Sequence, residues 1–291
     1  MRKYGVFIKT FLLLLIIVLV IMWMILGLGW YIFRYDNLGT VFLISLIVAV
    51  VVTFIMLVIM LKKEKNSPVA SLHNEYMKEI RENGYSDRFL ELADQGLKMC
   101  SSTDHDFVYQ KDFALYGAEA YILREEYDKA LEYLNKVDIN SITKKDLSFL
   151  DGGQGLAVFF AIQMEYCNQT KDVERARRVY NDAIGYIDDF YGKGDDMDLF
   201  IDDFYCYYNY LNGDYVQAKR HAEKIIDNNL HKKSKMIGGH LHLASIYKKL
   251  GDQEKVDELL DEAEKLLEES DSAISKQVYE IQKKRLQETD E

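Results

Sequence analysis

Residues 118–137, AEAYILREEYDKALEYLNKV, and residues 243–263, LASIYKKLGDQEKVDELLDEA, carry the pattern that determines the fold. Each stretch reads as the end of one helix, a short turn and a second helix, because apolar side chains recur three or four residues apart on both sides of the turn. An alanine or valine follows each turn at the same place, Ala130 in the first stretch and Val256 in the second. Small residues let two crossing helices approach closely while larger side chains fill the flanking space. The pattern therefore predicts helical hairpins.

Two further stretches repeat this pattern. Residues 166–184 read YCNQTKDVERARRVYNDAI, and residues 210–226 read YLNGDYVQAKRHAEKII. The equivalent positions, spaced 46, 42 and 38 residues apart, are Ala130, Ala176, Ala218 and Val256. Strand-like alternation is never sustained over five residues in this part of the chain. Because one hairpin cannot bury its apolar face, at least about three must stack, and we expect an all-α protein with an α-solenoid.

The repeated stretches resemble the tetratricopeptide-repeat (TPR) family over roughly residues 105–267. In the two best stretches, Ala118 with Tyr121 and Ala244 with Tyr247 occupy the first helix of the pair. The chain departs from the family in its spacings, which exceed the family's 34 residues, and in lacking the proline that usually closes a repeat. The resemblance implies a solenoid in which the first helices of the pairs line a concave surface that binds extended or helical peptides.

The sequence divides into five segments. They are an anchor over 1–65, a linker over 66–72, two leading helices over 73–104, TPR-like repeats over 105–270 and a capping helix over 271–291. The capping helix has Asp271 as its expected N-cap, and its charged face suits the polar end that a solenoid requires. The alternative for this last segment is an isolated coiled coil, but it contains fewer than three heptads.

The anchor rests on two apolar stretches, residues 11–33 and 38–61, which contain no charged side chain. Each exceeds the roughly 20 residues that cross a bilayer as a helix, so we expect a transmembrane hairpin in contact with lipid over 11–61. A cleaved signal peptide is the less favoured alternative, because the first stretch is too long and no small-residue cleavage site follows it. Lys and Arg gather outside the two stretches, which predicts a multi-pass protein of the cell membrane with both termini cytoplasmic.

Charge divides the chain in the same way. The first 65 residues hold seven Lys and Arg against two acidic residues, a net charge of +5, which leaves −16 of the total −11 for the other 226. Such an acidic domain is unsuited to nucleic acid, whose phosphates require clustered Lys and Arg. The three cysteines are widely spaced, which excludes a disulfide framework.

Catalytic and metal-binding motifs are missing from the sequence. There is no phosphate-binding loop, and the glycines of 151–158 open a helix rather than follow a strand. His240 and His242 are two residues apart, so on a helix they point to different faces and cannot share a metal. The acidic stretch 188–205 fails the EF-hand pattern and is interpreted as a loop whose aspartates cap the next helix. We therefore expect no cofactor, no metal and no enzymatic activity.

Candidate partner-binding residues lie on the first helices of the repeats, which the TPR resemblance places on the concave surface. They are Glu119, Glu165, Asp203, Tyr207 and Tyr210. About half of the tyrosines in the third repeat are expected in the core, and the others would form an acidic, aromatic groove for a basic or aromatic-rich protein or peptide.

These observations favour a membrane-anchored scaffold that recruits a protein or peptide partner to the cytoplasmic face of the membrane. The alternative is a peptide-responsive regulator that sequesters a signalling or secretion factor. An enzyme with an unrecognised site is the least favoured hypothesis, because no nucleophile–base pair, metal site or phosphate motif is visible.

Overall fold

The computed structural model describes residues 15–16, 23, 50–55, 67–100, 104–137, 154–192, 195–229 and 232–288 of the 291-residue chain. The chain divides into two compact units, Met1–Ser71 and Leu72–Glu291. The second unit contains nearly all of the described residues, and the description that follows concerns it.

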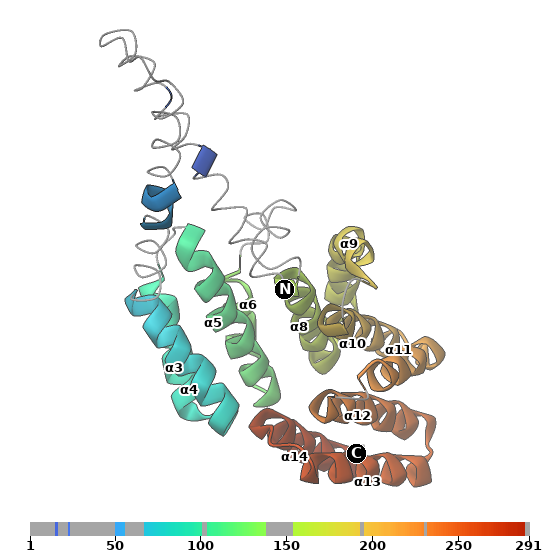
Figure 1. The fold of residues 1–291 in the computed structure, drawn as a ribbon. Helices are drawn as coiled ribbons and strands as arrows, with labels where there is room; N and C mark the ends of the chain where they lie inside the picture. The colour runs from blue at the N-terminus through green and yellow to red at the C-terminus, as the bar shows by residue number, and fades with distance from the viewer. Residues whose placement is uncertain are drawn as a thin grey trace, which may run out of the picture. The chain divides into compact units, whose positions relative to one another are not determined.

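The Leu72–Glu291 unit is built from helices wherever the structure describes it, which confirms the all-helical prediction. The helices are α3 (Pro68–Asn83), α4 (Asp87–Met99), α5 (Asp104–Leu123), α6 (Tyr127–Leu134), α8 (Gln154–Thr170), α9 (Val173–Phe190), α10 (Asp195–Leu211), α11 (Tyr215–Asp227), α12 (Lys233–Leu250), α13 (Gln253–Glu268) and α14 (Ala273–Gln287). Consecutive helices pair as antiparallel hairpins that pack side by side, in the manner of an α-solenoid (Figure 1).

Four of the hairpin turns share one backbone geometry. In each, an amide donates to the carbonyl five residues earlier, which closes the end of the first helix. The bonds are Glu126 to Tyr121 (2.9 Å), Asp172 to Cys167 (2.9 Å), Asp214 to Asn209 (2.9 Å) and Asp252 to Tyr247 (3.0 Å). The residue before each donor has a left-handed φ, at Glu125 (61°), Lys171 (57°), Gly213 (79°) and Gly251 (77°). The four accepting residues are 46, 42 and 38 positions apart, the same spacings that the sequence pattern has.

Three of these turns lead directly into a capped helix. Asp172, Asp214 and Asp252 are N-caps, and their carboxylates accept hydrogen bonds from the amides three residues later at 2.9, 3.1 and 3.1 Å. An aspartate here satisfies one of the four free amides at the helix start. The first repeat has Glu126 at this position, and its side chain makes no cap bond. The short turn and the aspartate together set the angle at which the second helix leaves the first.

Small residues fill the helix crossings, as the repeat pattern predicts. Ala130, Ala176, Ala218 and Val256 are all fully buried. At the α5–α6 crossing the same role falls to Gly117, where an added Cβ would lie 2.5 Å from the ring of Tyr133. That ring is itself held in place, because it packs edge-on against Tyr121 at 5.1 Å and its hydroxyl donates to Asp94. Close approach of the helices therefore depends on the absence of side-chain atoms at these positions.

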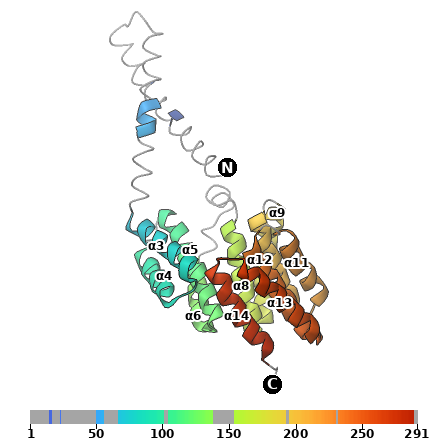
Figure 2. The ribbon, with the colours of Figure 1, turned by 60° about the horizontal axis from the view of Figure 1, so that its bottom comes forward.

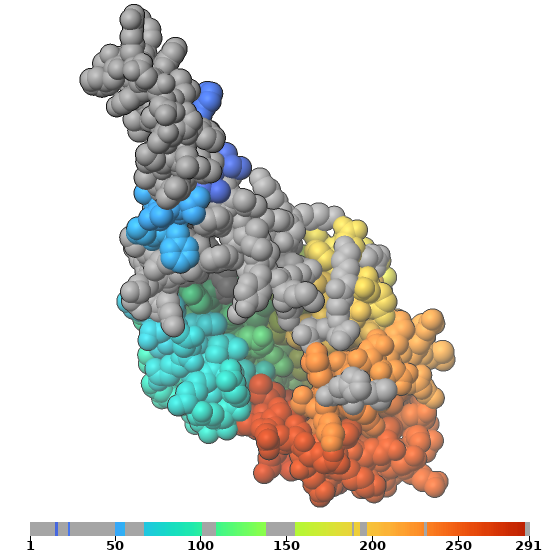
Figure 3. All heavy atoms as spheres, viewed as in Figure 1, coloured from blue at the N-terminus to red at the C-terminus, as the bar shows by residue number. Residues whose placement is uncertain are grey.

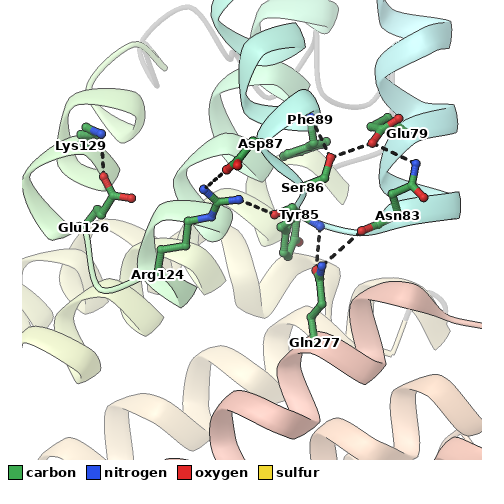
Figure 4. A network of polar contacts seen from close by, with 10 residues as sticks. All are labelled: Glu79, Asn83, Tyr85, Ser86, Asp87, Phe89, Arg124, Glu126, Lys129 and Gln277. Carbon is green, nitrogen blue, oxygen red and sulfur yellow. Dashed lines mark hydrogen bonds and ion pairs between the residues drawn. The ribbon is translucent and has the colours of Figure 1, made fainter.

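The last helix, α14, makes two kinds of contact. Its apolar side packs on α12 and α13, where Tyr279 and Leu286 are buried in the core of the C-terminal repeats. Its polar side reaches the first hairpin, since Gln277 accepts a hydrogen bond from the Tyr85 amide at 2.7 Å and donates to the Asn83 carbonyl at 3.2 Å. Figure 4 shows this contact at the α3–α4 turn, and Figure 2 shows α14 crossing the hairpin ends. In the space-filling view the C-terminal helices border α3 and α4 (Figure 3).

The prediction of a transmembrane hairpin, and with it that of a multi-pass membrane protein, is corrected by the structure. A span requires about 20 consecutive helical residues, and no helix in the described ranges is long and apolar enough to cross a membrane. Most of 11–33 and 38–61, and all of the loop between them, lies outside the described residues. The expected lipid contact over 11–61 and the cytoplasmic orientation depended on these spans and are withdrawn with them.

Three expected boundaries differ in detail from the structure. Helix α3 begins at Pro68, inside the expected linker, because proline suits the first helical position and Ser67 accepts a hydrogen bond from the Ala70 amide at 3.0 Å. The N-cap of α14 is Ser272, not Asp271, and it accepts from the Ser275 amide at 3.2 Å. Most of the acidic stretch 188–205 is helical, since only residues 191–194 separate α9 from α10.

Candidate functional site: an acidic groove

The inner face of the helical array encloses a cavity of about 830 Å³, which we call the groove. It is lined by side chains of α5, α8, α10, α12 and α14, together with Tyr85 from the α3–α4 turn. The second helices α6, α11 and α13 supply almost none of its lining, apart from Tyr215 at the start of α11. A cavity of this volume is in the range of sites that bind a small molecule or a few peptide residues.

Equivalent positions in the four repeats supply much of the lining. Two residues before the carbonyl that accepts the turn hydrogen bond, all four repeats present a side chain to the groove: Glu119, Glu165, Tyr207 and Ser245. Two residues after that carbonyl they present Leu123, Gln169, Leu211 and Lys249. These two positions are four residues apart, which places them on one helix face. The groove is thus a direct product of the repeat.

Two glutamates from neighbouring repeats form the acidic part of the groove. Burial raises the pKa of Glu119 to about 7, and the charge of Asp203 adds to the rise although the Tyr85 hydroxyl bond opposes it. Burial also raises the pKa of Glu165 to about 8, with further contributions from the charges of Glu119 and Asp203. A hydrogen bond from Tyr207 and the charge of Arg285 oppose that second rise. Near neutral pH this part of the groove therefore holds protons that ordinary carboxylates would have lost.

Asp203 differs from the two glutamates because it has a partner that can carry positive charge. His242 on α12 lies with its Nε2 2.9 Å from the Asp203 carboxylate, which links the third repeat to the fourth. Tyr207 packs edge-on against the same imidazole, with ring centroids 4.7 Å apart. The pair leaves Asp203 about a quarter exposed toward the groove.

The basic residues of the groove are held by other groups. Arg285 on α14 pairs with Glu125 at 3.0 Å and also donates to the Leu123 carbonyl and to Gln169. Lys248 donates to the backbone carbonyls of Arg285 and Glu288 at 2.9 and 2.6 Å. These bonds direct both cations to the end of α14 rather than to the glutamates.

All five residues predicted from the sequence to bind a partner line this one groove: Glu119, Glu165, Asp203, Tyr207 and Tyr210. Other aromatic residues of the third repeat pack away from it, for Phe204 is fully buried and Tyr208 stacks on Tyr180 at 4.2 Å. That these five residues bind a partner stays a prediction.

Sequence reasoning missed four residues of the groove: Tyr85, Asn168, His242 and Arg285. Asn168 and His242 lie on first helices close to the positions used for prediction, and repeat alignment alone could have found them. Tyr85 and Arg285 lie outside the four repeats, and only the packing of α14 against the first hairpin brings them together. No local pattern signals that contact.

A metal centre finds no support in the described part of the chain, where no three His, Cys, Asp or Glu side chains are grouped to hold an ion. His240 and His242 contact different elements, since His240 lies 3.2 Å from Glu262 on α13 while His242 faces α10. The cysteines of these ranges are free, and burial raises the pKa of Cys167 to about 12, which makes it a poor nucleophile.

Interpretation of this site rests on its geometry, because no family model, no curated protein and no solved structure matches the chain.

Proposed function

We propose that the Leu72–Glu291 unit is a TPR-like binding module whose groove holds a segment of a protein or peptide partner, and that the protein acts as a scaffold or adaptor. The observation that carries this proposal is the groove itself. One face of each repeat contributes to a single cavity with aromatic walls and carboxylates from three successive first helices. Aromatic side chains supply large contact areas with few rotatable bonds, which suits them to binding surfaces.

Site-specific photo-crosslinking tests the proposal. A benzophenone amino acid replaces Tyr210, which lines the groove, and in a matched variant it replaces Tyr191, which is exposed and absent from the groove lining. With the full chain in its native cells, we expect discrete protein or peptide adducts from position 210 and none of the same mass from position 191. Identical adducts at both positions, or none at 210, would refute a partner-binding groove.

A second candidate function is a peptide-responsive regulator that sequesters a signalling or secretion factor. One contact favours it: Arg285 both lines the groove and pairs with Glu125 across the gap between the last helix and the α5–α6 turn. An occupant of the groove would thus meet a residue that joins the two ends of the array. Hydrogen exchange in α14 distinguishes the candidates, since a regulator requires altered protection when the groove is filled, and a simple adaptor does not.

A further inference from the structure

The groove contains more negative charge than the protein neutralises. Asp203 has His242 at 2.9 Å, but neither Glu119 nor Glu165 has an ion pair among the described residues. Their hydrogen bonds come from tyrosine hydroxyls, Tyr85 to Glu119 and Tyr207 to Glu165. A neutral donor compensates a buried carboxylate less than a cation does. The protein therefore leaves these two carboxyl groups without a counterion.

A second observation concerns the same groove. The side-chain oxygen of Asn168 on α8 is buried and accepts no hydrogen bond, although Asn168 lines the groove. Buried acceptors in folded proteins nearly always have a donor, so an unsatisfied one requires an explanation. A ligand that brings N–H groups into the groove would supply the missing donor.

Resting on the proposed function, we infer that the partner segment inserts a cationic side chain, the guanidinium of arginine or the ammonium of lysine, between Glu119, Glu165 and Asp203. A guanidinium matches the site well because it presents five donors, enough for the carboxylates and for the Asn168 oxygen. It also stacks favourably on the aromatic rings of Tyr207 and Tyr210. An anionic or purely apolar group would leave the carboxylates and the amide oxygen unsatisfied.

Proton release should accompany binding of the cation. The empty groove keeps protons on Glu119 and Glu165 because burial raises their pKa values to about 7 and about 8, and a bound cation favours the ionised forms. Affinity should therefore rise with pH between about 6 and 9. The other titratable and charged groups facing the groove are Tyr85, Glu125, Lys171, Asp203, Tyr207, Tyr210, Tyr215, His242, Lys248, Lys249 and Arg285.

Immobilised hexapeptide libraries test the inference. Each library has one position fixed as arginine, lysine, citrulline or glutamate and the others randomised, and the purified full chain is applied. Charge-assisted hydrogen bonds predict about tenfold or greater preference for arginine over citrulline, its neutral isostere. For wild type this preference should grow about tenfold from pH 6 to pH 9.

Two variants identify the groups responsible. The double variant E119Q/E165Q keeps the shapes of both side chains and should lose the preference and its pH dependence. The control E132Q removes a carboxylate whose side chain is 65% exposed on α6, outside the groove lining, and should retain both.

The outcomes separate the inference from the proposed function. Equal retention of arginine and citrulline libraries, or a preference that survives in E119Q/E165Q, would overturn the inference. Adducts at position 210 would in that case still support a partner-binding groove. If no library is retained at all, the inference likewise falls, and the crosslinking result alone decides the proposed function.

Discussion

Replacing Glu165 by glutamine should make the protein more stable at high pH and leave its stability nearly unchanged at low pH. Burial raises the pKa of this carboxyl group from its ordinary value of 4.5 to about 8. The unfolded chain loses the proton near pH 4.5, whereas the folded protein keeps it until about pH 8. Folding is therefore favoured by the bound proton below about pH 4.5, and this contribution is lost as the pH rises to about 8. Glutamine has no charge to bury, so the variant lacks this pH dependence.

The magnitude follows from the size of the shift. One pKa unit corresponds to about 1.4 kcal/mol, so a rise of about 3.5 units sets an upper limit of about 5 kcal/mol at pH 9. Two features of the groove reduce this figure. Glu165 is only half-buried and faces a cavity, and part of the shift belongs to its interaction with Glu119. Allowing for both effects, we expect E165Q to exceed wild type by about 2 kcal/mol at pH 9 and by less than about 0.5 kcal/mol at pH 5.

Urea unfolding followed by circular dichroism at 222 nm measures this difference at pH 5, 7 and 9. The matched control is E132Q, which removes an exposed carboxylate paired with Lys136 at 3.0 Å and should stay within about 0.5 kcal/mol of wild type at every pH. A difference between E165Q and wild type that does not grow with pH would show that Glu165 is ionised at no cost, and the reasoning about the groove would be wrong.

Two further predictions concern packing. G117A should lower the free energy of unfolding by about 1–3 kcal/mol, because its methyl group meets the ring of Tyr133, whereas G185A, with nothing within 4 Å, should raise it by up to about 1 kcal/mol; equal effects in urea unfolding would contradict the assigned helix crossing. Q277A removes both hydrogen bonds from α14 to the first hairpin and should cost about 1–2 kcal/mol, with faster hydrogen exchange at the Tyr85 amide, and unchanged exchange there would exclude the contact.

The repeats could be predicted from sequence because their determinants are local. The left-handed turn residue, the capping aspartate and the small residue after it fall within about ten positions, so Gly251, Asp252 and Val256 identify the fourth hairpin without any knowledge of its neighbours. The same locality places Glu119 and Glu165 on one face of their helices. Both predictions need only the helical period and the position of the turn.

The remainder of the groove depends on contacts between distant parts of the chain. Tyr85 meets Gln277 across 192 positions, and neither residue belongs to a recognisable motif. The membrane prediction failed for a related reason. Hydropathy counts apolar residues, whereas a span requires an uninterrupted helix of sufficient length, and none of the helices in the described ranges meets that requirement.

The contact between α14 and the first hairpin also has a consequence for folding and for the size of the array. In an open solenoid each repeat touches only its neighbours, so terminal repeats fray first and the number of repeats can vary without penalty. Here Gln277 joins the last helix to the α3–α4 turn, so fraying of the first hairpin must also break a contact with the other end. This contact between distant residues raises the contact order, which predicts slower folding than for an open array of the same length. Inserting one more hairpin would separate Gln277 from Asn83, so the closure restricts the protein to its present number of repeats.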